Sequence, residues 1–134
     1  MIVDTSALVA ILFGEPEQSA LIDAIDAIDR DGAPKLSAIS RIEATMVYVG
    51  RRTRADPKTV ADLIHVLGLQ VVMVDKQQTD RALDAFLRFG KGRHPARLNL
   101  GDCFSYALAA SVDEPLLFKG DDFLKTDIVP AWRP

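Results

Sequence analysis

Short apolar runs alternate along the chain with longer segments in which apolar residues recur every three or four positions. The runs predict buried strands at residues 1–4, 35–38, 71–74 and 115–118, with a short edge strand at 128–129. The longer segments predict helices over residues 7–13, 17–30, 40–54, 57–67, 76–89 and 101–111. Strands that alternate with helices are typical of a parallel sheet. The pattern therefore predicts an α/β fold in a single domain, residues 1–134.

Polar residues mark the expected starts of several helices. Ser6 is expected to cap the first helix, and Asp75 the helix that runs to residue 89. Ser40 and Glu43 have the spacing of a capping box at the start of the third helix. These residues set the predicted helix boundaries.

Composition excludes several classes of protein. The chain has 134 residues and a single cysteine, Cys103, so a disulfide framework and a cysteine-based zinc site are excluded. No run approaches the roughly 20 apolar residues of a membrane span, and the start carries Asp4 without a basic residue, unlike a signal peptide. We therefore expect a cytoplasmic protein. The motifs of serine hydrolases, P-loop NTPases and dinucleotide-binding proteins do not occur.

Charge is segregated along the chain although the net charge is only -3. Residues 1–31 hold seven acids and one base, whereas residues 32–101 hold twelve Lys and Arg against six acids. Basic residues cluster twice in this middle region, first as Arg51, Arg52 and Arg54, then as Arg88, Lys91, Arg93, His94 and Arg97. Either cluster can be an ordinary solvated surface. The second lies in a segment rich in Gly and Pro, which favours a binding loop.

Acids follow all but one of the predicted strands. Asp4 ends the first strand, Glu43 and Asp102 lie in first turns of later helices, and Asp121 and Asp122 follow the last strand. The carboxyl ends of parallel strands share one rim, where ligands bind. Converging carboxylates repel one another unless a cation neutralises them, and oxygen ligands suit Mg²⁺ or Mn²⁺. The pattern therefore predicts metal-assisted hydrolysis of a phosphodiester.

Each acid also has a purely structural explanation. Asp4 can cap a helix, Glu43 can complete the capping box, and Asp102 can complement the helix dipole. Asp121 and Asp122 can form an ordinary acidic turn. Two other functions also stay open. One is a phospho-acceptor signalling domain, although the first strand supplies only one acid, and the other is a catalytically silent module that binds RNA or protein.

The segments MIVDTSALVAIL, RIEA, LNLGDCFSYALA and PLLFKGDDFLKTDI occur in this order across nearly the whole chain. Together they resemble the PIN-domain ribonucleases and, more narrowly, the VapC toxins of type II toxin–antitoxin systems. The resemblance implies a three-layer α/β/α sandwich with a mainly parallel sheet. It implies an endoribonuclease that depends on Mg²⁺ or Mn²⁺ and leaves a 5′-phosphate and a 3′-hydroxyl. It also implies a homodimer, neutralised by a VapB-like antitoxin whose tail occupies the active-site groove.

The same resemblance gives roles to individual residues. Asp4 and Asp102 match the acids that hold the metal, Glu43 matches another acid of the catalytic quartet, and Ser6 matches a hydroxyl residue near the metal. A T-x-D pattern of the family is replaced by Phe118-Lys119-Gly120-Asp121-Asp122. The fourth acid is therefore Asp121 or Asp122, with Asp127 a more distant candidate.

The substrate is expected to be tRNA or another structured RNA, so that cleavage inhibits translation until the antitoxin binds. The RNA backbone is expected to be held by Lys91, Arg93, His94 and Arg97, with Arg51, Arg52 and Arg54 as further candidates. Such contacts to phosphate give affinity that depends on salt but do not select a sequence.

Overall fold

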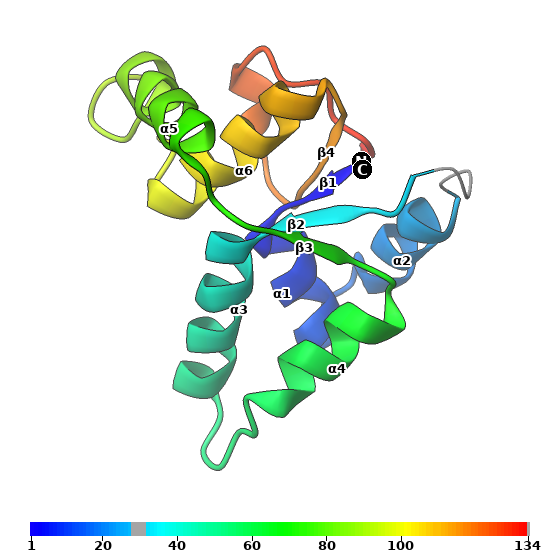
Figure 1. The fold of residues 1–134 in the computed structure, drawn as a ribbon. Helices are drawn as coiled ribbons and strands as arrows, with labels where there is room; N and C mark the ends of the chain where they lie inside the picture. The colour runs from blue at the N-terminus through cyan, green and yellow to red at the C-terminus, as the bar shows by residue number, and fades with distance from the viewer. Residues whose placement is uncertain (28–31, 134) are drawn as a thin grey trace.

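A computed structural model describes residues 1–27 and 32–133. The elements run in the order β1 (Ile2–Val3), α1 (Thr5–Phe13), α2 (Gln18–Asp26), β2 (Lys35–Ser37), α3 (Ala38–Arg51), α4 (Lys58–Val66), β3 (Gln70–Val72), α5 (Lys76–Phe89), α6 (Leu100–Val112), β4 (Leu116–Leu117) and the 3₁₀ turn η1 (Phe123–Lys125) (Figure 1). The expected extension of the second helix over residues 28–30 lies outside the described residues.

The four strands form one parallel sheet in the order β3-β2-β1-β4. Helices α1 to α4 cover one face, and α5 and α6 cover the other (Figure 1). The predicted α/β/α sandwich is therefore confirmed. The edge strand expected at residues 128–129 is wrong, because this segment makes only an isolated bridge between Leu116 and Pro130.

Neighbouring residues in each central strand supply the two halves of the core. Ile2 and Leu116 pack among the residues of α5 and α6, whereas Val3 and Leu117 pack among those of α1 to α4. Successive side chains of a strand point to opposite faces, so a two-residue apolar strand can fill both layers. Cys103 is buried in the α6 side of the core, as expected. Among the described residues, no helix has the length and apolar character needed to cross a membrane.

Two predicted helix starts are wrong. Asp4 rather than Ser6 caps α1, because the Asp4 carboxylate accepts the backbone N–H of Ser6. Ser37 caps α3 three residues before the expected cap, with its hydroxyl accepting from the Ile39 N–H. Ser40 is fully buried and its Oγ lies 3.1 Å from Oγ of Ser105, so it forms no capping box. The predicted cap at Asp75 is confirmed.

The sheet reverses its winding between β1 and β4. The chain builds outward from β1 through β2 to β3 and then returns, over the opposite face, to place β4 on the other side of β1. In parallel α/β sheets, ligands bind beyond the carboxyl ends of the strands at such a reversal. Asp4 follows β1 and Lys119 lies two residues after β4, so this point is where the acids were expected to meet.

Candidate active site

The side chain of Asp4 is almost wholly buried at the end of β1, with 1% exposed. Its Oδ2 accepts two hydrogen bonds from Ser6, one from the backbone N–H at 2.8 Å and one from the hydroxyl at 2.6 Å. Its Oδ1 has no hydrogen-bond partner among the described residues. A buried carboxylate oxygen without a partner costs at least about 1–3 kcal/mol. Among the described residues, Oδ1 of Asp4 is the one buried carboxylate oxygen without a hydrogen-bond partner, and a cation would satisfy it.

A chain of hydrogen bonds joins the ends of β1 and β4. The backbone N–H of Lys119 donates to the Ser6 hydroxyl at 3.0 Å, and that hydroxyl donates to Asp4 Oδ2. Ser6 therefore fixes the orientation of the Asp4 carboxylate. The Lys119 ammonium lies farther out and binds Glu15 and Glu17 at 2.6 and 2.8 Å.

The side chain of Glu43, on α3, lies beside the residues that follow β1. Its Oε2 accepts a hydrogen bond from the Thr5 hydroxyl at 2.8 Å. The carboxylate lies against Gly101 so closely that a Cβ at position 101 would be 2.1 Å from Oε2. Only glycine at this position leaves the Glu43 carboxylate where it is. Thr5 and Gly101 thus position Glu43.

Asp102 lies in the first turn of α6 and completes a capping box. Its Oδ2 accepts the backbone N–H of Asn99, whose own side chain accepts the Asp102 N–H. Burial first, and then the negative charges of Asp4, Glu43 and Asp122, together raise the pKa of Asp102 to about 7, although the hydrogen bond from the backbone of Asn99 lowers it. Nearby cations have the opposite effect on a carboxylate pKa. The site therefore favours a proton or a cation near neutral pH.

These residues line one pocket of about 430 Å³. Its lining consists of Asp4, Thr5, Ser6, Val9, Glu15, Glu43, Val47, Arg51, Asn99, Asp102, Lys119 and Gly120. Within residues 1–27 and 32–133, no three side chains of Asp, Glu, His or Cys converge closely enough to form a complete metal cage. Mg²⁺ typically keeps several waters and takes one or two carboxylates, so the donor set fits such an ion through Asp4 and Asp102.

The structure separates the two candidates for the fourth acid. Asp122 contributes to the raised pKa of Asp102, which places its charge near the pocket. Both acids lie within ion-pair distance of the Lys125 ammonium, Asp121 at 3.2 Å and Asp122 at 3.8 Å, and Asp121 is the more exposed of the two. Asp127 binds Arg88 and the Tyr106 hydroxyl instead, away from the pocket lining. Asp122 is therefore the better placed of the three, although it does not itself line the pocket.

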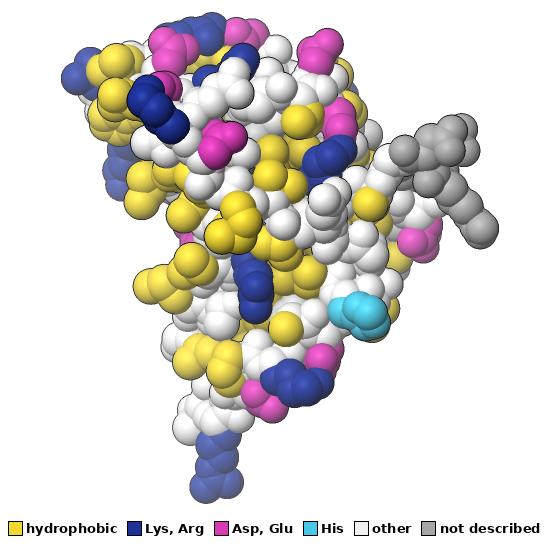
Figure 2. Space-filling model, in the orientation of Figure 1, with side chains coloured by type: hydrophobic (Ala, Val, Ile, Leu, Met, Phe, Trp, Pro, Cys, Tyr) yellow, Lys and Arg dark blue, Asp and Glu magenta, His cyan; other side chains and the backbone are white. Residues whose placement is uncertain are grey.

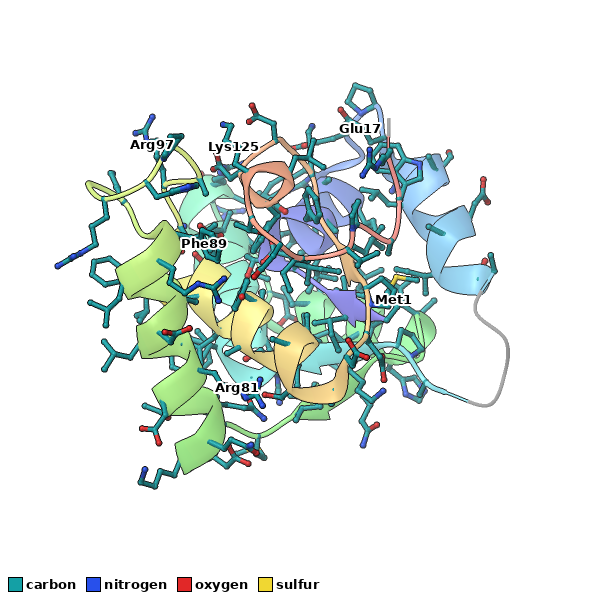
Figure 3. All side chains as sticks on the ribbon, turned by 90° about the horizontal axis from the view of Figure 1, so that it is seen from above. Met1, Glu17, Arg81, Phe89, Arg97 and Lys125 are labelled. Carbon is teal, nitrogen blue, oxygen red and sulfur yellow. The ribbon has the colours of Figure 1, made fainter. Side chains whose placement is uncertain are left out.

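The basic loop of residues 91–97 closes through the backbone, with the Lys91 N–H donating to the Leu98 carbonyl. Lys91, Arg93 and Arg97 are exposed, and His94 is half-buried with its ring against Phe89. None of the four predicted RNA-binding residues lines the carboxylate pocket. In the view of Figure 3, Arg97 and Lys125 lie along the same side of the molecule as Glu17, which binds the pocket residue Lys119.

Sequence reasoning missed four residues that contact the charged residues of this site, namely Thr5, Asn99, Gly101 and Glu15. Asn99 carried a usable signal, because Asn followed three residues later by an acid fits an N-cap. The other three act through contacts between segments that are distant in the sequence. Lys119, which a phospho-acceptor domain would use at its acid, binds two glutamates instead.

A family model and the sequences of known proteins both indicate the same family for this chain. The model of the PIN domain matches residues 1–129. Ribonuclease VapC42 of Mycobacterium tuberculosis is 46% identical over 133 residues, which cover 98% of both chains.

Solved structures share the fold at much lower sequence identity. The crystal structure of Mycobacterium tuberculosis VapC20, described as a sarcin-ricin loop cleaving toxin, has a TM-score of 0.78 at 16% identity and covers 99% of this chain and 98% of its own. A toxin–antitoxin complex from Klebsiella pneumoniae has a TM-score of 0.69 at 15% identity, with the same coverage.

Proposed function

The chain belongs to the PIN-domain family and, within it, to the VapC endoribonucleases of toxin–antitoxin systems, and we propose that Asp4 and Asp102 hold one or two divalent cations, Mg²⁺ or Mn²⁺, for this cleavage. The observation that carries the proposal is the buried, unpartnered Oδ1 of Asp4 beside an Asp102 whose pKa is raised to about 7. A cation held by these two residues would neutralise the charge of both carboxylates.

When bound, such a cation lowers the pKa of a water and neutralises charge on the phosphodiester. Ser6 holds the Asp4 carboxylate in one orientation, and Thr5 does the same for Glu43. In the proposed reaction Glu43 accepts a proton from the attacking water, whose oxygen bonds to phosphorus. The bond between phosphorus and the 3′-oxygen breaks, and the 3′-oxygen takes a proton from solvent water, which gives a 5′-phosphate and a 3′-hydroxyl. Asp122 is proposed as the fourth acid, since its charge reaches Asp102.

The test compares Asp4→Asn with Asp113→Asn, a control at the exposed C-terminal end of α6. Asp4→Asn should abolish both RNA cleavage and the stabilisation of the fold by Mn²⁺, measured as the shift of Tm, while circular dichroism stays native. Asp113→Asn should keep both. Full cleavage by Asp4→Asn would falsify the metal-site assignment. The RNA itself, which we propose is tRNA or another structured RNA of the cytoplasm, is identified by sequencing the 5′-phosphate ends formed on brief expression.

A VapB-like antitoxin is the proposed protein partner, and α3 offers the surface for it. A hollow of about 810 Å³ lies between α3, the start of α4 and the β3 edge, lined by Ile42, Met46, Val49 and Met73 among others. A second hollow of about 660 Å³ shares Ile42 and Met46 and extends to Glu43 at the carboxylate pocket. Figure 2 shows hydrophobic side chains gathered over this face. An apolar helix seated there could pass a polar tail to the acids.

A homodimer is proposed through α5 and the start of α6. Leu83, Phe86 and Leu100 are exposed there around a hollow of about 340 Å³. Exposed apolar residues that cluster in this way mark interaction surfaces. A stable dimer needs about 800 Å² buried on each partner, more than this hollow alone supplies, so neighbouring parts of α5 are included.

Two variants separate these interfaces. Leu83→Glu should give a monomer by light scattering and still be neutralised by the antitoxin. Met46→Glu should stay dimeric and escape neutralisation. Loss of both properties in either variant, with native circular dichroism, would contradict the assignment of separate surfaces.

A further inference from the structure

Two arginines at the end of α3 are held against aromatic rings beside the carboxylate pocket. The guanidinium groups of Arg51 and Arg52 each lie 5.4 Å from the centroid of the Phe13 ring. Arg52 also lies 5.6 Å from the Tyr48 ring, and Phe13 packs against Tyr48 with 5.8 Å between centroids. A cation over an aromatic face is attracted by the ring, so these flexible side chains are partly ordered in advance.

Arg51 is the member of this pair that lines the pocket with Asp4, Glu43 and Asp102. Among the described residues, no carboxylate lies within 4.0 Å of the guanidinium of Arg51 or Arg52. The positive charge of Arg51 is therefore available beside the pocket.

The other cation of the pocket differs in this respect. Lys119 binds both Glu15 and Glu17, so its charge is already neutralised. A phosphate that approached Lys119 would have to displace two carboxylates, whereas one that approached Arg51 would displace only water. The two walls of the pocket are therefore unequal in their attraction for an anion.

We propose that Arg51, held on Phe13, contacts the RNA phosphate next to the one that is cleaved, and that the RNA strand enters the pocket from the end of α3. The proposal rests on the ribonuclease function above. A guanidinium binds phosphate through two parallel N–H donors, a geometry that lysine does not offer. Arg52 contacts the rings of both Phe13 and Tyr48 and so helps to hold the Phe13 ring in place. The main contact with the RNA backbone then comes from α3 and not from the loop of residues 91–97.

The test measures binding of a short, fluorescently labelled single-stranded RNA of mixed sequence in an Asp4→Asn background, where cleavage does not interfere. Arg51→Gln should weaken binding about tenfold, as expected for loss of one charged hydrogen-bonded contact. It should also lower the slope of log affinity against log salt by about 0.7. Arg54→Gln removes the same charge three residues later, outside the pocket lining, and should change affinity less than about threefold. Equal effects of the two substitutions would overturn the proposal in favour of a diffuse electrostatic attraction.

Phe13→Leu gives an independent readout, because it removes the ring and keeps every charge. It should weaken RNA binding several-fold while leaving the salt slope unchanged. Unchanged affinity in Phe13→Leu, with native circular dichroism, would show that the ring does not position Arg51. Failure of the ribonuclease function is seen separately, as absence of RNA cleavage by the wild-type chain with Mn²⁺. A wild type that cleaves, together with an Arg51→Gln variant that binds normally, would overturn only the inference about Arg51.

Discussion

Replacing Gly101 by alanine probes the contact on which the position of Glu43 depends. A Cβ at this position would lie 2.1 Å from Glu43 Oε2 and 2.8 Å from its Cδ. Carbon atoms do not approach so closely, so the Glu43 carboxylate must move in Gly101→Ala. That movement breaks its hydrogen bond of 2.8 Å from the Thr5 hydroxyl.

Two opposing contributions set the size of the effect. Loss of a hydrogen bond to a charged group costs about 1.5–3 kcal/mol. Alanine in place of glycine inside a helix contributes about 1 kcal/mol of stability. The free energy of unfolding of Gly101→Ala should therefore fall by about 0.5–2 kcal/mol, and Tm should fall by about 2–8 °C. RNA cleavage should fall much further, because Glu43 no longer faces the pocket.

Urea denaturation of a double-mutant cycle isolates the cause. Once Glu43→Ala has removed the carboxylate, Gly101→Ala meets no obstacle and should stabilise the protein by up to about 1 kcal/mol. Gly50→Ala is the matched control, because a Cβ there has nothing within 4 Å and should also stabilise α3. If Gly101→Ala destabilises the protein equally with and without Glu43, the contact with Glu43 is not the reason for glycine at this position.

Two further outcomes follow from single contacts. The pKa of Asp102 rises from 3.8 to about 7 on folding, so ionisation of this carboxyl is disfavoured in the folded, metal-free chain. The free energy of unfolding should therefore fall as the pH rises from about 4 to about 7. Asp102→Asn should flatten this part of the stability–pH profile in urea denaturation, and an unchanged profile would contradict the assignment. Tyr106→Phe removes the hydroxyl that donates to Asp127 at 2.8 Å and should lower the free energy of unfolding by about 1 kcal/mol. An unaltered urea midpoint would show that this bond does not stabilise the C-terminal segment.

The order and type of the six helices and four strands among the described residues could be predicted from the sequence, because apolar residues recur every three or four positions in the helices and form short runs in the strands. Helix starts were harder. Ser37 and Ser40 are both able to cap α3, and the choice depends on a contact with Ser105 that no local pattern contains. The prediction of an edge strand at residues 128–129 was also wrong because pairing depends on distant residues, and this segment makes a single bridge to β4.

For the site, the sequence predicted that the acids would meet but treated capping and chemistry as alternatives. Asp4 and Asp102 show that a carboxylate which caps a helix can also line the pocket. In Asp4, Oδ2 caps α1 while Oδ1 stays without a partner. In Asp102, the capping box coexists with a raised pKa. Thr5 and Gly101 could not be predicted because their importance lies in one contact each with Glu43, which is distant in the sequence.

The hydrogen bond between Lys119 and Ser6 spans 113 positions of the chain, and β1 also pairs with β4 across nearly the whole sequence. Such long-range contacts form late, because the chain between them must first be made and ordered. During synthesis on the ribosome, Asp4 emerges early but lacks the neighbours that hold and enclose it until Lys119 has also emerged. We therefore expect the nascent chain to lack ribonuclease activity until almost all of it has been translated.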